Sequence, residues 1–441
     1  MTALSENVPA DVPGISVPAG PRAGVTVQQA AGDRPARVPA PSGGRGKRPR
    51  LVHVDAMRPV KQFGVVSTHS LQAFGAAASL WYGGTLMVTH VTRYAFMFIS
   101  AAMLVYAYPA LNRSRLKVFW RRRLLAVAVP YVTWTVIYFL LEVAQSGGAG
   151  GVAGSLEHLG YLLATGYDQL YYLVLLIEFY LVYPLLLWVI RRTARHHWAL
   201  LAAVLGIQVA LSALVHWGHV PGWMNNRDAT RELWNYLLYV FAGGVMAWHY
   251  HEAHAWLCRH WRAILAGTAA AWLAAEAWYL LSAARVPFFA AADPQGPASP
   301  IQPAEIPLFL GLIAIIYLFG VWLGGRRRPR LVRAFARSGA DYSYGIYLSQ
   351  VLLLTALTTA GWRNLDHRLP WPAVTVAGIL IVFSASWALT ALLARLPGAR
   401  GTAGIPRRSW RLRRDTGPVS PAGPAPRGTA GLPVPAPRRI P

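Results

Sequence analysis

Ten apolar runs of about 20 residues, separated by short polar or basic stretches, constrain this chain more than any other feature. A run of this length spans the ~30 Å hydrocarbon core of a bilayer as an α-helix, which satisfies its own backbone N–H and C=O groups. The composition agrees, since 55% of the 441 residues are hydrophobic and only 13% are charged. The sequence therefore predicts an all-α, polytopic membrane protein. The ten predicted spans cover about 60–82, 85–108, 123–145, 170–190, 198–216, 233–250, 263–283, 305–323, 342–361 and 371–395.

The Lys and Arg residues between these runs predict the orientation of the protein. They concentrate in the loops after the second, fourth, sixth and eighth spans, whereas the 146–168 loop on the opposite side has none. By the positive-inside rule, both termini are then cytoplasmic, and we expect a multi-pass protein of the cell (plasma) membrane. The net charge of +25 lies in these loops and in the two ends of the chain. We therefore expect these Lys and Arg residues to interact with the lipid bilayer and not with nucleic acid.

The two ends of the chain differ from its middle in composition and in hydrophobic periodicity. Residues 1–57 and 396–441 are rich in Pro, Gly and Arg and show no helical or strand period, which predicts disordered tails around a membrane domain at 58–395. The single cysteine, Cys258, excludes an intrachain disulfide and a Cys-cluster metal site. The histidines near it, from His249 to His260, fit no zinc-finger spacing, so we expect no metal.

Four ionisable residues stand within the first two predicted spans: Arg58, His69, His90 and Arg93. Such groups inside a membrane indicate a functional site by default. Arg58 and His69 are eleven positions apart, so both project from nearly one helix face with His69 about 16 Å further along, near mid-depth. We predict a turn at Gly83–Gly84. That turn would place Arg93 on the returning helix, about 14 Å from the turn, where it can approach His69.

Six stretches of the chain, taken in order, carry a family resemblance. They are Arg58-x10-His69, THVTRYAFMFISAAMLVYAY (89–108), FWRRRLLAVAVPYVTWTVIYF (119–139), QLYYLVLLIEFYLVYPLLL (169–187), YVFAGGVMAW (239–248) and SYGIYLSQVLLL (343–354). Together they resemble the acyltransferase 3 family of integral-membrane acyltransferases, over roughly 58–395. The chain departs from the family pattern at two positions. Ala101 follows Ser100 where the family has a Gly, and Gln350 stands where the family usually has a His. A Gln cannot titrate, which argues against a proton role there.

The resemblance implies roles for three residues. His69 would act as the general base that takes the proton of an acceptor hydroxyl, for which an imidazole is suited near neutral pH. The alternative is a packing histidine bonded to a neighbouring helix. Arg93 would stabilise the oxyanion or clamp the acyl donor. Alternatively, Arg93 pairs with Glu178, which stands in the middle of the fourth span and needs a partner, or Glu178 orients the imidazole.

Other residues are candidates for substrate binding. Arg121, Arg122 and Arg123 begin the third span and can clamp the phosphates of coenzyme A, or serve topology alone. We also assign Arg58 and His90 to acyl-CoA binding. On the ninth span, Tyr344, Tyr347 and Gln350 share one helical face and line the acceptor path, or simply bond between helices.

The predicted function is the transfer of an acyl group, in particular acetyl, from cytoplasmic acyl-CoA to a hydroxyl. The resemblance implies a carbohydrate, glycolipid or glycosylated metabolite as the acceptor, with acyl-CoA as the donor and no permanently bound cofactor. The alternative is a proton-coupled transporter or flippase that uses the intramembrane His, Arg and Glu as a proton relay.

Overall fold

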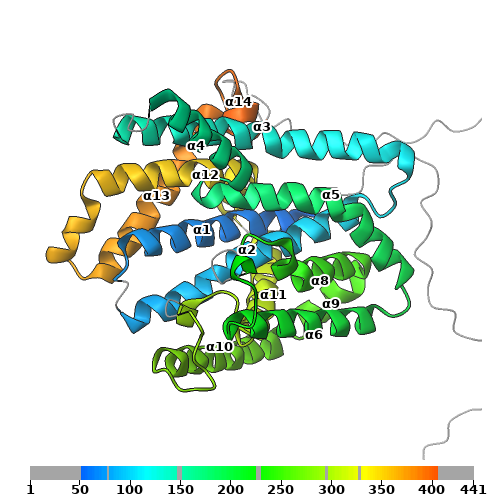
Figure 1. Ribbon diagram of the computed structural model, residues 1–441. Coiled ribbons are helices and arrows are strands. Elements are labelled where there is room, and N and C mark those ends of the chain that lie inside the picture. The colour runs from blue at the N-terminus through cyan, green and yellow to red at the C-terminus, as the bar shows by residue number, and fades with distance from the viewer. Residues whose placement is uncertain are drawn as a thin grey trace, which may run out of the picture. The chain divides into compact units, whose positions relative to one another are not determined.

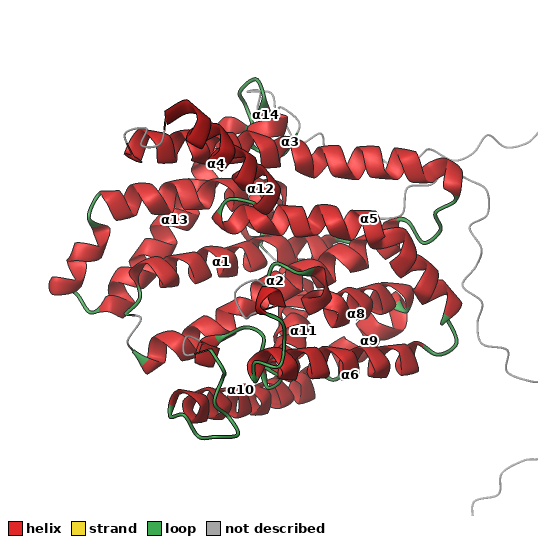
Figure 2. Ribbon diagram, viewed as in Figure 1, coloured by secondary structure: helices red, strands yellow, loops and turns green. Residues whose placement is uncertain are grey.

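The computed structural model describes residues 51–76, 79–146, 151–224, 230–293, 296–325 and 329–405. These residues belong to one compact unit that begins at Arg50. Every regular element within them is a helix (Figure 2), which confirms the predicted all-α class. Most of the two predicted tails, residues 1–50 and 406–441, lies outside the described residues.

The chain folds into long helices joined by turns and loops of different lengths (Figure 1). The longer helices are α1 (Val52–Phe74), α2 (Leu80–Ala107), α3 (Arg113–Ser146), α4 (Gly151–Thr165), α5 (Tyr171–Arg192), α6 (His197–His216), α8 (Leu237–Trp248), α9 (Tyr250–Arg259), α10 (Trp261–Ala283), α11 (Glu305–Leu323), α12 (Arg330–Thr359) and α13 (Trp371–Leu393). The shorter elements are η1 (Asp168–Leu170), η2 (Gly222–Met224), η3 (Leu233–Tyr236), η4 (Gly296–Ala298), η5 (Trp362–His367) and α14 (Ala399–Thr402).

In the described part of the chain, 7 helices are long and apolar enough to cross a membrane: α2, α3, α5, α6, α10, α11 and α13. Three further predicted spans correspond to α1, α12 and η3 with α8, which are more polar or shorter. The helix α1 contacts α2, α11, α12 and α13, so protein surrounds it on several sides (Figure 1). This central position explains how α1 carries Asp55, Arg58, Lys61 and His69, because charged groups in membrane helices face the protein interior.

The predicted turn at Gly83–Gly84 is wrong, because both glycines lie inside α2 and are buried. The chain reverses earlier, between the end of α1 and the start of α2. The glycines instead allow α10 to approach α2 closely. A Cβ at Gly83 would collide with the hydroxyl of Tyr279, and one at Gly84 would meet the Glu276 carboxylate at 2.6 Å. Small residues at a helix contact play this part in membrane proteins.

The start of α1 also differs from the prediction, because the helix begins at Val52 rather than near residue 60. Val54 is buried, and the ring of His53 lies 2.9 Å from the Tyr250 hydroxyl of α9, so these extra turns pack against protein. The helix also ends earlier than predicted, at Phe74, so His69 is five residues from that end and lies closer to it than the predicted mid-depth.

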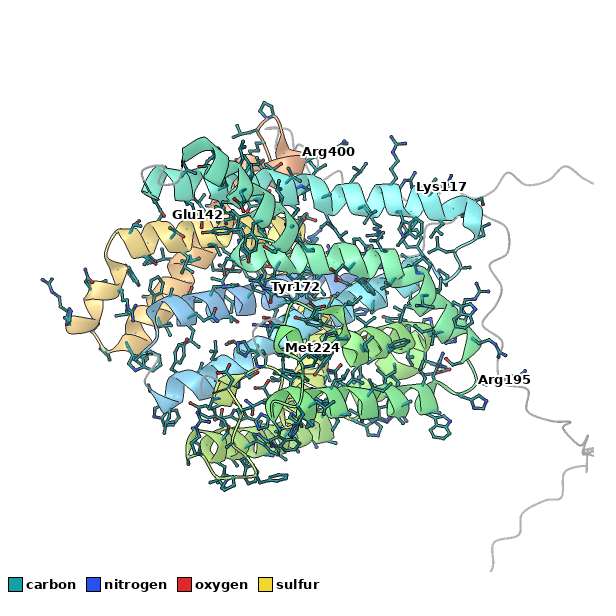
Figure 3. The ribbon with its side chains drawn as sticks, in the orientation of Figure 1. Lys117, Glu142, Tyr172, Arg195, Met224 and Arg400 are labelled. Atoms are coloured by element: carbon teal, nitrogen blue, oxygen red, sulfur yellow. The ribbon has the colours of Figure 1, made fainter. Side chains whose placement is uncertain are left out.

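The 146–168 segment, predicted as a loop, contains the helix α4, which packs on α3. His158 of α4 bonds to Glu142 of α3 at 2.9 Å (Glu142 is labelled in Figure 3). The Tyr131 hydroxyl of α3 donates to the Leu163 carbonyl at 2.9 Å. The start of this segment is rich in Gly, which is typical of a loop. Its second half carries enough apolar residues to cover α3.

Residues 396–405 were expected to belong to a disordered tail, and the structure describes them as a short segment packed on α3. The Trp134 indole N–H of α3 donates to the Thr402 carbonyl at 2.9 Å. Ala399 and Ala403 are buried in this contact, which their small side chains permit. The described part of the chain therefore extends about ten residues beyond the predicted boundary.

The contact between α2 and α8 gives a first testable prediction. A Cβ at Gly243 of α8 would collide with the Phe98 carbonyl of α2, which is backbone and cannot move aside. We expect Gly243→Ala to destabilise the protein by about 1–3 kcal/mol, measured by thermal unfolding in detergent. Gly206→Ala is the matched control, since nothing lies within 4 Å of that Cβ. It should be neutral or stabilising, and equal unfolding temperatures for the two variants would contradict the prediction.

Candidate functional site

A cavity of about 380 Å³ lies where α1, α2, the η1–α5 segment and α12 meet. Tyr172, one of its walls, is labelled near the middle of the ribbon in Figure 3. The lining residues are Val65, Thr68, His69, Gln72, Thr92, Arg93, Phe96, Asp168, Gln169, Tyr171, Tyr172, Thr230, Arg231 and Tyr347. The cavity therefore draws on segments that are far apart in the sequence.

His69 and Arg93 both line this cavity, as the spacing argument expected. Both side chains are half-buried. The adjacent Thr68 hydroxyl lies 3.0 Å from the Gly64 carbonyl and 3.2 Å from the Thr89 carbonyl, and this bond fastens α1 to α2 beside the imidazole. An imidazole and a guanidinium that share one enclosed space can handle a proton and a developing negative charge together.

Aromatic side chains form the wall of the cavity on the α5 and α12 side. The Tyr172 hydroxyl donates to the Arg93 carbonyl at 3.1 Å, and its ring lies 5.0 Å from that of Phe96. The Tyr347 hydroxyl donates to the Gln169 carbonyl. Tyr347 was predicted to line the acceptor path, and it does line this cavity. These bonds link α5 to α2 and α12 to η1 around the site.

The sequence reading missed Asp168, which stands at the rim of the cavity in η1. Its backbone has φ of 34°, a left-handed value that Asp tolerates better than most residues. The carboxylate is exposed, and His69 lies within electrostatic range of both Asp168 and Arg93. Strained backbone positions of this kind cluster at functional sites. The sequence signal for Asp168 is an acid directly before an apolar run, at the end of the predicted 146–168 loop.

The rim also carries Arg231, from the segment that precedes η3. Its guanidinium lies 5.5 Å from the Tyr171 ring, and both residues line the cavity. Gln72 of α1 adds an exposed amide to the rim. The cavity therefore has a polar mouth with both signs of charge.

Glu178 does not join this site, which corrects the predicted pairing with Arg93. It is exposed on α5, while its helix neighbours Leu175, Leu176 and Phe179 are buried. The buried acid near Arg93 is instead Glu305, the first residue of α11, which is 1% exposed. Neither of its carboxylate oxygens has a hydrogen-bond partner among the described residues.

Three other predicted residues lie close to the cavity without lining it. His90 is buried behind His69 and Arg93, within electrostatic range of both, and its Nδ1 has no partner among the described residues. Tyr344 and Gln350 stand on either side of Tyr347 along α12. Gln350 is 1% exposed, and both of its amide atoms lack partners in the described part of the chain.

The predicted acyl-CoA-binding arginines lie outside the cavity. Arg58 is 3.8 Å from Asp55 on α1, and Arg123 on α3 lies 5.3 Å from the Tyr108 ring. Both act electrostatically on Tyr180, so they approach one region between α1, α3 and α5. Arg121 and Arg122 are exposed on α3. This region lies toward the end of the bundle where α1 and α3 begin, near the labelled Lys117 in Figure 3.

The histidines around α9 bond to their neighbours rather than to a common centre. His254 lies 2.8 Å from the Tyr317 hydroxyl, and the Cys258 sulfur is 3.9 Å from the His254 ring. Burial raises the pKa of the Cys258 thiol, which disfavours a thiolate ligand. Across the residues that the structure describes, no group of three or more His, Cys, Asp or Glu side chains could hold a metal ion.

A comparison with models of protein families identifies the family of this chain. A family model described as an acyltransferase domain matches residues 52–391, more than half of the chain and all of the cavity. The chain belongs to the acyltransferase 3 family. Searches of curated proteins and of solved structures found no match. With the apolar helices, this membership makes the protein a membrane acyltransferase and confirms the resemblance seen in the sequence.

Proposed function

We propose that this acyltransferase 3 protein moves an acyl group, in particular acetyl, from acyl-CoA to a hydroxyl of a carbohydrate, glycolipid or glycosylated metabolite. The observation that carries the proposal is that His69 and Arg93 line one cavity within an acyltransferase domain. No permanently bound cofactor is needed for such a transfer, because the thioester already activates the acyl group.

The proposed step uses the two residues together. The neutral His69 imidazole takes the proton of the acceptor hydroxyl while the oxygen attacks the thioester carbonyl carbon. The new C–O bond pushes the carbonyl electrons onto oxygen, and the Arg93 guanidinium stabilises that oxyanion. Collapse of the intermediate breaks the C–S bond, and the leaving thiolate takes the proton from the imidazolium. Asp168, at the rim, would orient His69 and stabilise its charged form.

The distribution of charge supports opposite entry routes for the two substrates. Arg58 and Arg123 lie toward the end of the bundle where α1 begins, whereas the polar mouth with Asp168 and Arg231 lies at the other end of α1. By the positive-inside rule we propose that the first end, with both termini, is cytoplasmic in the plasma membrane. The donor would then enter from the cytoplasm and the hydroxyl acceptor from outside.

The proposal is tested with purified protein in nanodiscs and acetyl-CoA labelled in the acetyl group. We expect slow release of the CoA thiol without acceptor, and faster release when membrane glycolipids or sugars are added. The label should then move to the acceptor. Thiol release no faster than in empty nanodiscs, with every acceptor pool tried, would refute acyl transfer from CoA.

A transporter or flippase remains the second candidate, favoured by one observation. Glu305 and His90 are titratable groups buried near Arg93, and acids and histidines inside the membrane form the proton relays of transporters. Proton-coupled flux in proteoliposomes, without thioester turnover, would support this candidate over the enzyme.

A further inference from the structure

Lys61 carries a buried positive charge that the proposed step does not use. It stands on α1 between Arg58 and His69 and is 5% exposed. No hydrogen bond or ion pair reaches its ammonium from the described residues. The cation nearest on its own helix is Arg58, one turn away, which adds repulsion. A buried cation without an acidic partner is costly, so such a residue in a membrane helix indicates a function.

Among the described residues, the Lys61 ammonium contacts an aromatic ring. Its Nζ lies 3.0 Å from the centroid of the Phe96 ring, a cation–π contact. A cation–π contact offsets only part of the cost of burying the ammonium. Phe96 also lines the His69 cavity. The ammonium therefore lies directly behind one wall of the proposed active site.

The position of Lys61 along α1 matches a place on the donor route. Lys61 lies about 12 Å from His69 along the helix axis and Arg58 about 16 Å, both toward the start of α1. In acyl-CoA, the pantetheine arm separates the thioester from the phosphate groups by a comparable length. If the thioester lies beside His69, the phosphates lie near these two cations.

We propose that Lys61, with Arg58, is a binding site for the phosphate groups of the acyl donor. This inference rests on the proposed function, because it requires acyl-CoA as the donor. When the site is empty, the Phe96 ring covers the ammonium and closes the cavity on this side. When the donor binds, its phosphates replace the ring as the partner of Lys61, and the pantetheine arm takes the route that Phe96 closes.

The test measures CoA binding to the full-length protein in nanodiscs by calorimetry. Lys61→Met keeps an unbranched apolar side chain of similar length and removes the charged ammonium. We expect CoA to bind roughly ten- to a hundredfold more weakly, since a hydrogen bond to a charged group is lost. Lys61→Arg should bind CoA nearly as well as the wild type. Arg363→Met, which removes an exposed cation of η5 away from the donor side, is the control and should leave binding unchanged.

A second substrate separates a phosphate site from a structural role. Acetyl-pantetheine lacks the phosphates, so Lys61→Met should turn it over as fast as the wild type does. Unchanged CoA binding by Lys61→Met, or an equal loss with both donors, would overturn the subsite. If this variant does not fold, Arg58→Gln replaces it, with the same expected and refuting results. A wild type that binds no CoA at all would refute the proposed donor itself.

Discussion

Replacing His69 by Gln is expected to lower kcat/KM for acetyl transfer by about 10²–10⁴-fold, the range typical of losing a general base. Gln fills much of the same space and keeps hydrogen-bonding groups, but it cannot take a proton near neutral pH. Because the imidazole lines the cavity without carrying the donor phosphates, CoA binding should stay unchanged. The measurement is labelled acetyl-CoA turnover in nanodiscs, together with calorimetric CoA affinity.

His216 provides a matched control for this prediction. It is a histidine with 4% exposure, and its ring lies 3.0 Å from the Phe289 carbonyl in a region outside the cavity. His216→Gln should leave the turnover rate unchanged, although it removes a structural bond. Near-wild-type turnover by His69→Gln would contradict the role of His69 as a base and favour a packing histidine.

The proximity of His69 and Arg93 could be predicted from the sequence because the signal there is strong. An Arg and a His on one face of a helix, followed by an Arg on the next span, are rare within a membrane, and they brought attention to Arg58, His69 and Arg93. The predicted turn at Gly83–Gly84 was wrong, yet Arg93 still lines the cavity with His69. The error followed from treating glycines as turn residues, whereas in α2 they serve close packing against α10.

The acids of the site were harder to predict, because their position depends on tertiary structure. Glu178 was a candidate because it is an acid within an apolar run, but it lies on the exposed face of α5. Glu305 and Asp168 stand at the first turns of their elements, where an acid is ordinary, and nothing local shows that Glu305 is buried. Lys61 was not singled out at all, because nothing local to a lysine near the start of a predicted span shows that it is buried.

Asp168 gives the second large effect, because the proposed mechanism uses it to position His69. Asp168→Asn keeps the shape of the side chain and tolerates the same left-handed backbone. Carboxylates that orient a catalytic imidazole contribute up to about 10⁴-fold. Asp168 is exposed, so we expect a loss nearer 10²-fold. The loss should fall on kcat, with KM for acetyl-CoA unchanged, since the donor does not need this carboxylate.

A double variant distinguishes positioning from general damage to the cavity. If Asp168 acts only through the imidazole, adding Asp168→Asn to His69→Gln should cause no further loss, because there is no base left to orient. Glu142→Gln is the control, since this acid bonds to His158 on α4 and does not line the cavity. A further large loss in the double variant would show that Asp168 contacts the substrate itself, and would move it from a positioning to a binding role.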